Sequence, residues 1–149
     1  MGPGSGQFRV IRQYAKPVLR LILAAFYAYA GYLHIVRPEP FLSIMPAAIP
    51  FPDEIVFWTG IAEIAGAIGL VQPWSLRLRR AAGIGLALYA LCVWPANINH
   101  FAMDMARESM GEDGGLGLIY HIPRMIAQPV IIWWALWAGE VRLPRMRRD

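Results

Sequence analysis

Hydrogen-bonding side chains gather at the end of an apolar stretch, CVWPANINHFAMD, at residues 92–104. Pro95 is expected to bend this helix and to leave the Leu91 carbonyl without its usual donor. Asn97 and His100 are three residues apart and therefore share one helical face. An amide can bond to a carboxylate or a ligand, and a neutral imidazole can bind a metal ion. The stretch therefore predicts a polar binding position inside apolar surroundings.

Glu63 and Arg124 are the strongest candidates for acid and base chemistry. Glu63 follows Glu54 by nine residues, so it lies about 13 Å along a helix and well inside an apolar segment. An ionised carboxylate there needs a cation, and without one desolvation favours its neutral form. Arg124 and Gln128 share a face of another apolar segment. We predict that Glu63 and Arg124 are catalytic partners in one polar chamber; the alternative is an ion pair that only fixes helix packing.

The three histidines fall at the ends of three different apolar segments, so they are candidates for convergence. His34, His100 and His121 would offer neutral imidazoles to Zn or Cu, although their spacing matches no known metal motif and such histidines also bond headgroups or helix ends. A quinone or another oxygen-bearing small molecule, held between aromatic walls, is the other candidate. The residues predicted to bind a ligand are Asn97, Gln128, His100, His34 and Tyr32.

The elements that must position these side chains are membrane helices. Of 149 residues, 57% are hydrophobic, and the mean hydropathy is +0.41, which is too apolar for an ordinary soluble domain of this size. A bilayer core of about 30 Å takes about 20 apolar helical residues. The sequence predicts an all-α fold, an integral membrane four-helix bundle over residues 18–139. Its spans are 18–36, 54–71, 81–101 and 118–139.

Basic residues predict the orientation of this bundle. Loops that stay in the cytoplasm carry an excess of Lys and Arg. We therefore expect a multi-pass protein of the bacterial inner membrane with both termini cytoplasmic, a flexible segment 1–17 and a basic tail 140–149. One side holds eleven of the 14 basic residues, namely Arg9, Arg12, Lys16, Arg20, Arg77, Arg79, Arg80, Arg142, Arg145, Arg147 and Arg148.

The partners expected from composition are lipids. Basic residues beside membrane spans favour anionic headgroups, and they argue against nucleic acid as the partner. Cys92 is the single cysteine, so one copy cannot form a disulfide. The first span lacks a cleavage pattern and is expected to act as its own anchor.

Two connections are expected on the outer side. Residues 37–53 carry five prolines among apolar residues, which predicts a capping segment folded over the mouth of the bundle. Residues 103–117 are acidic and glycine-rich, which predicts a mobile loop.

Four segments of the chain together resemble the DoxX family of small four-span membrane proteins. They are AGYLHIVRPEPFLSIMP, GIAEIAGAIGL with the arginines that follow it, WPANINHF, and PRMIAQPVIIWWA, and the resemblance covers residues 18–138. Some members are subunits of thiosulfate:quinone oxidoreductase, others belong with redox or oxidative-stress complexes, and distant relatives assist protein maturation. The matching positions are His34, Pro46, Glu63, Gly66, Pro95, Asn97, Arg124 and Gln128.

The expected function follows from the polar chamber together with this resemblance. We predict an oxidoreductase subunit of a quinone-linked redox system, in which the chamber of Glu63 and Arg124 binds quinone or relays protons. A redox partner protein or a second copy of the chain in a homo-oligomer would complete this redox system. The alternatives are a non-enzymatic assembly factor that clamps a partner's helix and, less favoured because four spans show no inverted repeat, a small-molecule transporter.

Overall fold

The computed structural model describes residues 4–111 and 115–141, with side chains described from residue 14 onward. The elements are α1 (Gly4–Val36), α2 (Glu39–Leu42), α3 (Pro52–Val71), α4 (Leu76–Ser109) and α5 (Gly117–Ala138). No strand occurs in these ranges. The all-α prediction is therefore confirmed.

Local chemistry explains where α3 and α4 begin. Pro52 starts α3, where its missing N–H costs nothing, and Phe51 before it has a left-handed backbone (φ 52°). Ser75 caps α4, since its hydroxyl oxygen accepts a hydrogen bond from the Leu78 N–H at 3.2 Å. α4 continues through Pro95 to Ser109, so the loop expected from residue 103 is helical in its first half.

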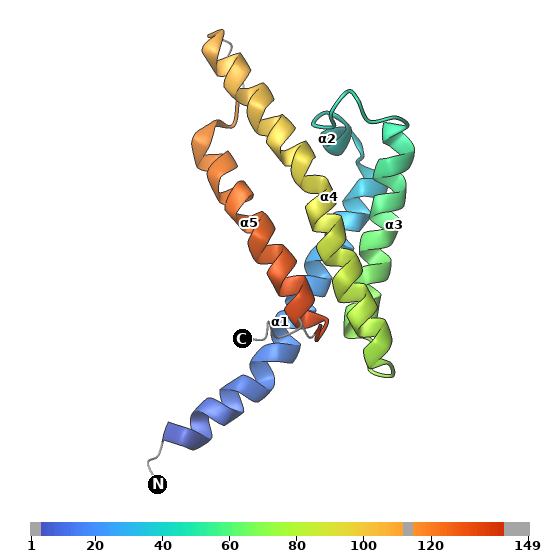
Figure 1. Cartoon of the computed structure of the whole chain (residues 1–149), viewed down its shortest axis with the longest axis vertical. Helices are drawn as coiled ribbons and strands as arrows, with labels where there is room; N and C mark the ends of the chain where they lie inside the picture. The colour runs from blue at the N-terminus through green and yellow to red at the C-terminus, as the bar shows by residue number, and fades with distance from the viewer. Residues whose placement is uncertain (1–3, 112–114, 142–149) are drawn as a thin grey trace, which may run out of the picture.

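Several helix bounds differ from the predicted spans. α1 begins at Gly4 and passes through Pro17, so the segment expected to be flexible is helical from its fourth residue. Figure 1 shows this amino-terminal part of α1 extending away from the other helices. α2 is a single short turn between two prolines within the expected capping segment. The basic tail beyond Val141 lies outside the described residues.

Close helix contacts depend on glycines. α1 packs along α3, α3 against α4, and α4 against α5 (Figure 1). A Cβ built on Gly31 of α1 would lie 2.5 Å from the Gly60 carbonyl oxygen of α3. A Cβ built on Gly83 of α4 would lie 2.8 Å from the Gly139 Cα. Small residues therefore let these helices approach at backbone distance, as in membrane bundles.

Within the part of the chain that the structure describes, three helices are long and apolar enough to cross a membrane: Tyr14–Val36 in α1, Pro52–Val71, and Leu76–Ser109. α5 matches the fourth predicted span in position but is not among the three, because its prolines, aromatic residues and polar groups lower its hydropathy. Most outward side chains of α5 are nevertheless apolar, and they include Leu118, Ile119, Ile122, Ile126, Val130 and Trp133.

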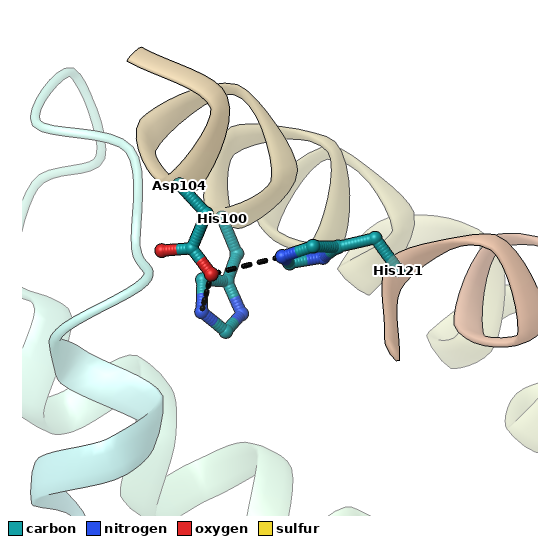
Figure 2. A group of neighbouring side chains, drawn as sticks. All are labelled: His100, Asp104 and His121. Atoms are coloured by element: carbon teal, nitrogen blue, oxygen red, sulfur yellow. Dashed lines mark hydrogen bonds and ion pairs between the residues drawn. The ribbon is translucent and has the colours of Figure 1, made fainter. Parts of the chain in front are cut away.

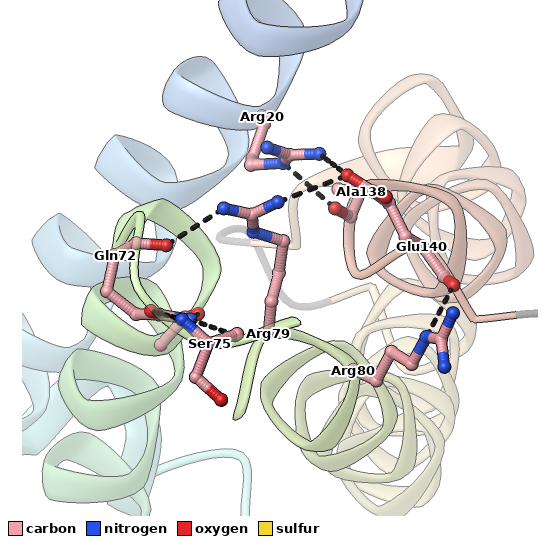
Figure 3. Close-up of polar contacts among 8 residues, drawn as sticks. Arg20, Gln72, Ser75, Arg79, Arg80, Ala138 and Glu140 are labelled. Atoms are coloured by element: carbon pink, nitrogen blue, oxygen red, sulfur yellow. Dashed lines mark hydrogen bonds and ion pairs between the residues drawn. The ribbon is translucent and has the colours of Figure 1, made fainter. Parts of the chain in front are cut away.

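A polar network closes the end of the bundle that contains the α3–α4 turn, here called the base end. Arg20 of α1 bonds the Ala138 carbonyl at 2.9 Å and pairs with the Glu140 carboxylate. Arg79 of α4 reaches the same carboxylate at 3.2 Å and the Gln72 carbonyl at 2.9 Å (Figure 3). The network therefore joins α1, α4 and the end of α5.

Glu140 is the acid at the centre of this network, just beyond α5. Burial raises the pKa of its carboxyl group, but the positive charges of Lys16, Arg20 and Arg79 outweigh burial, so the net pKa lies below its ordinary value. The opposite end of the bundle, here called the cap end, carries α2 and the ends of α1 and α4 (Figure 1).

Candidate functional site

A cavity of about 400 Å³, here called the chamber, lies between the helices on the cap-end side of the core. α1, α3, α4 and α5 all contribute to its wall, and Phe41, Ile44 and Met45 line it from the capping segment. Most of its wall is apolar. The exceptions among its wall residues are His34, Thr59, Glu63, Asn97, Arg124 and Gln128, together with the hydroxyl groups of Tyr27 and Tyr89.

Glu63 lies on this wall and is 3% exposed. Its Oε2 is 3.3 Å from Nδ1 of His34 on α1, which is an ion-pair contact when the imidazole is protonated. The contact lacks hydrogen-bond geometry, and no other group bonds this buried oxygen. Thr59, one turn before Glu63, lies 3.3 Å from the same imidazole nitrogen through its hydroxyl oxygen. His34 is held further by its edge-on contact with Phe41, at 3.8 Å between ring centroids. A buried carboxyl oxygen therefore remains open for a further partner.

Arg124 lies on the same chamber wall, but its hydrogen-bond partners are His100 and Tyr120, not Glu63. Its Nη1 is 2.8 Å from Nδ1 of His100 and donates to the Tyr120 hydroxyl at 3.0 Å. Its guanidinium also lies 5.5 Å from the centre of the Tyr120 ring. Among the described residues, no ion pair joins Arg124 to Glu63. The predicted partners thus share one chamber, and each has a histidine as its neighbour.

The predicted ligand-binding residues divide between the chamber and other places. Asn97 and Gln128 are buried and border the chamber with their amides. Tyr32 is 55% exposed and is not on the wall. The reason is helical geometry: Tyr27 and His34 face the chamber from α1, and Tyr32 is displaced from Tyr27 by roughly 140° around the helix axis. The structure therefore does not bring Tyr32 together with the other residues predicted to bind a ligand.

A second polar group lies beside Arg124, between α4 and α5. His121 is fully buried and its Nε2 is 2.9 Å from Oδ2 of Asp104. His100 Nε2 lies 3.5 Å from the same oxygen, as Figure 2 shows, and the Leu116 backbone N–H donates to it at 3.0 Å. The three side chains are here called the His100–Asp104–His121 cluster.

The hydrogen positions in this cluster follow from Arg124. An arginine can only donate, so Nδ1 of His100 accepts and its proton is on Nε2, facing Asp104. His121 is likewise expected to donate through Nε2 to the carboxylate. As arranged, the cluster is a set of hydrogen bonds that converge on one carboxyl oxygen.

The histidines predicted to share a metal ion are distributed over both sites. His100 and His121 come together, whereas His34 contacts Glu63 in the chamber. In the described ranges, one group of three side chains could hold a metal ion, and its third member is Asp104 instead of His34. Sequence reasoning missed Asp104 because it placed this residue in a loop. The available signal was its position four residues after His100, on the same helical face.

Taken together, fold and site define a bundle of apolar helices with a buried, partly polar chamber. The chain belongs to a family described as a domain of unknown function (DUF8561), whose model matches residues 23–139. No curated protein and no solved structure matches the chain. The resemblance to the DoxX family is therefore wrong, since the match is to this uncharacterised family and no DoxX model matches. Activities of DoxX members carry no weight for this protein.

The chemistry that the chamber offers is limited to a few groups. Glu63 and His34 can hold or pass a proton, the amides of Asn97 and Gln128 can bond oxygen atoms, and Arg124 adds a cation. Aromatic and aliphatic side chains make up the rest of the wall. Such a site suits a mostly apolar molecule with one or two polar atoms.

Proposed function

We propose that the protein spans the bacterial inner membrane four times, with α5 as the fourth span. The outward faces of α1, α3 and α4 carry large apolar side chains, and so does α5. The polar residues of α5 turn the other way, since His121 and Gln128 are buried. A helix with apolar residues outward and polar residues inward suits a lipid environment.

We propose further that the base end, and with it both termini, faces the cytoplasm. The arginines that meet Glu140 lie at this end, and cytoplasmic loops are rich in such residues. Cysteine labelling tests the orientation. In a Cys92→Ser background, an impermeant maleimide should label Met110→Cys in intact cells and Ser75→Cys only after the cells are opened. The reverse pattern would contradict the orientation.

We propose that the chamber binds a lipid-soluble molecule with a flat apolar body and oxygen atoms, a quinone being the simplest member of this class. One observation carries this proposal: the buried Oε2 of Glu63, on the wall of an apolar cavity, accepts no hydrogen bond of good geometry, although Nδ1 of His34 lies 3.3 Å away. Leaving a polar atom buried and unpaired is unfavourable. A bound molecule would supply the missing partner.

The dimensions and groups of the chamber support this ligand class. Its volume of about 400 Å³ falls in the usual range of small-molecule sites, roughly 300–1,000 Å³. Tyr27 and Tyr89 offer ring surfaces, while Asn97 and Gln128 can donate to quinone oxygens. The Glu63 and His34 pair would relay protons to such a ligand. The protein would then serve as a subunit of a quinone-linked redox system, with a partner protein supplying electrons.

Filling the chamber tests the proposal. The purified protein in detergent is titrated with decylubiquinone, a short-chain quinone, and tryptophan fluorescence is recorded. Ala127 lies on the chamber wall, so Ala127→Phe should weaken binding at least tenfold, or about 1.4 kcal/mol. Its neighbour Ile126 is 61% exposed, so Ile126→Phe is the matched control and should bind as the parent does.

Two results would count against quinone binding. One is equal affinity in the Ala127→Phe and Ile126→Phe variants. The other is a gently purified protein that carries no quinone by mass spectrometry but one stoichiometric membrane polypeptide. That second outcome would favour an assembly factor that holds a partner's helix.

A further inference from the structure

The His100–Asp104–His121 cluster has the composition of a metal site. Two imidazoles and a carboxylate come from two helices, with His121 Nε2 and His100 Nε2 at 2.9 Å and 3.5 Å from Oδ2 of Asp104 (Figure 2). One ligand atom from each residue lies within 4.8 Å of the other two. We propose that this cluster binds a divalent transition-metal ion of the Zn²⁺ type. The site is separate from the chamber and does not depend on its ligand.

The distances between the ligand atoms suit such an ion. Zn²⁺ binds imidazole nitrogen and carboxylate oxygen at about 2.0–2.2 Å, so neighbouring ligand atoms in a tetrahedral site are roughly 3.3 Å apart. The two measured separations, 2.9 Å and 3.5 Å, lie on either side of that value. Two histidines with one carboxylate also leave a fourth position open for water.

The surroundings hold the ligands in place before an ion arrives. Asp104 is 2% exposed and His121 is fully buried, so neither side chain is free to turn into solvent. The Leu116 N–H donates to Oδ2 of Asp104 at 3.0 Å, and outer hydrogen bonds of this kind orient metal-binding carboxylates. His100 is partly exposed, which leaves a side from which an ion can enter.

Two arginines oppose metal binding: Arg107, whose Nη1 lies 3.9 Å from Oδ1 of Asp104, adds a positive charge, and Arg124 competes directly for His100. When Nε2 of a neutral histidine binds a metal, its proton must be on Nδ1. Nδ1 of His100 is where Arg124 now donates, at 2.8 Å, so two donors would face each other. Arg124 must therefore release His100 when the ion binds. It can keep its bond to the Tyr120 hydroxyl, or turn toward the chamber that it already borders.

Because Arg124 competes with the metal ion for His100, the proposal predicts that removing Arg124 increases metal affinity. Arg124→Leu removes both the competing donor and a nearby positive charge, so it should raise metal affinity roughly tenfold. A cluster that serves only as a hydrogen-bonded contact between α4 and α5 would gain no metal affinity from this substitution.

Cobalt substitution is the experiment. Co²⁺ is added in excess to the full-length protein in detergent, visible absorption reports ligand binding, and bound Co²⁺ per chain is counted by elemental analysis after desalting. We expect one ion per chain. His100→Gln and Asp104→Asn should each reduce the affinity roughly hundredfold. His34→Gln is the control, since His34 contacts Glu63 in the chamber and takes no part in the cluster.

The folded state of each variant is checked by size-exclusion chromatography and circular dichroism. His100→Gln is the primary variant because its side chain is partly exposed, so it is the least disturbing to packing. The proposal is overturned if the parent protein shows no Co²⁺ absorption bands, if His34→Gln loses binding as much as His100→Gln does, or if Arg124→Leu binds no more tightly than the parent.

Discussion

The close contact between α1 and α3 leads to a prediction whose size follows from the coordinates. A Cβ added at Gly31 would lie 2.5 Å from the carbonyl oxygen of Gly60 and 2.9 Å from Cγ1 of Ile64, whereas ordinary contact begins at 3.4 Å. The first of these atoms belongs to the backbone, so no side-chain rotation relieves it. In Gly31→Ala the two helices must therefore move apart by about 0.9 Å along this line (3.4 − 2.5).

The energetic result combines two opposing contributions. Forcing an extra methyl group into a packed contact costs about 1–3 kcal/mol. Replacing glycine by alanine inside a helix returns up to about 1 kcal/mol. Because the clash is with backbone atoms, the cost lies near the upper end of its range, so the net expectation is a loss of about 2 kcal/mol, or a fall in Tm of about 4–8 °C for a chain of this length.

The same movement should affect the chamber. A Cβ built on Gly60 lies 2.8 Å from Cβ of His34, so this histidine is packed into the contact that Gly31→Ala would widen. Its separation from Glu63, now 3.3 Å between Nδ1 and Oε2, should increase. Binding of decylubiquinone should weaken together with stability.

Thermal unfolding in detergent, followed by circular dichroism, measures the change. Gly85→Ala is the matched control, because a Cβ at Gly85 meets nothing within 4 Å. That variant should equal the parent or gain a few degrees through helix propensity. If Gly31→Ala unfolds at the parent's temperature or higher, the backbone contact between α1 and α3 is not as described.

Three further outcomes are expected. Glu140→Gln should lower the free energy of unfolding by about 1 kcal/mol or less, since Glu140 is partly exposed. Because the pKa of Glu140 is depressed in the folded state, the parent protein has this stabilisation above the unfolded-state pKa and loses it as the pH falls through the folded-state pKa. Unfolding curves recorded at several pH values measure this loss. Asn99→Ala removes the hydrogen bond to the Ile44 carbonyl, so hydrogen exchange in the capping segment should become faster. Tyr32→Ala should leave decylubiquinone affinity unchanged, whereas Tyr89→Ala, on the chamber wall, should reduce it.

Much of the fold could be predicted from the sequence, because apolar length and charge position act locally. The segment 54–71 matches α3 almost to the residue, since prolines and acids precede it and Gln72 and Pro73 follow it. The end of α4 could not be predicted in this way. Polar residues after Phe101 indicated a loop, but Asp104 is stabilised inside the helix by His121 of α5, a contact that no local pattern contains.

The candidate site was predictable to a similar degree. Glu63, Asn97, Arg124 and Gln128 border one chamber, as expected for polar residues that avoid lipid. Their pairing was not predictable, because the rotation of each helix about its axis depends on packing. Glu63 meets His34, which the sequence analysis had assigned both to the ligand-binding residues and, with His100 and His121, to a metal ion.

The family assignment shows a different limit of what can be predicted from the sequence. A few polar residues in apolar helices, followed by arginines, satisfy the same physical demands in different helix bundles. Such a pattern resembled the DoxX family, yet the chain belongs to an uncharacterised one. Such a pattern therefore does not by itself assign a membrane protein to a family.

The central claim is that a buried acid faces a chamber open to lipid-soluble molecules. Dicyclohexylcarbodiimide tests it most directly, because this apolar reagent adds to a protonated carboxyl group and rearranges to a stable N-acylurea that mass spectrometry can locate. We expect modification at Glu63, protection by decylubiquinone, and loss of modification in Ala127→Phe but not in Ile126→Phe. Absence of the adduct at Glu63, or equal modification in both variants, would contradict the claim.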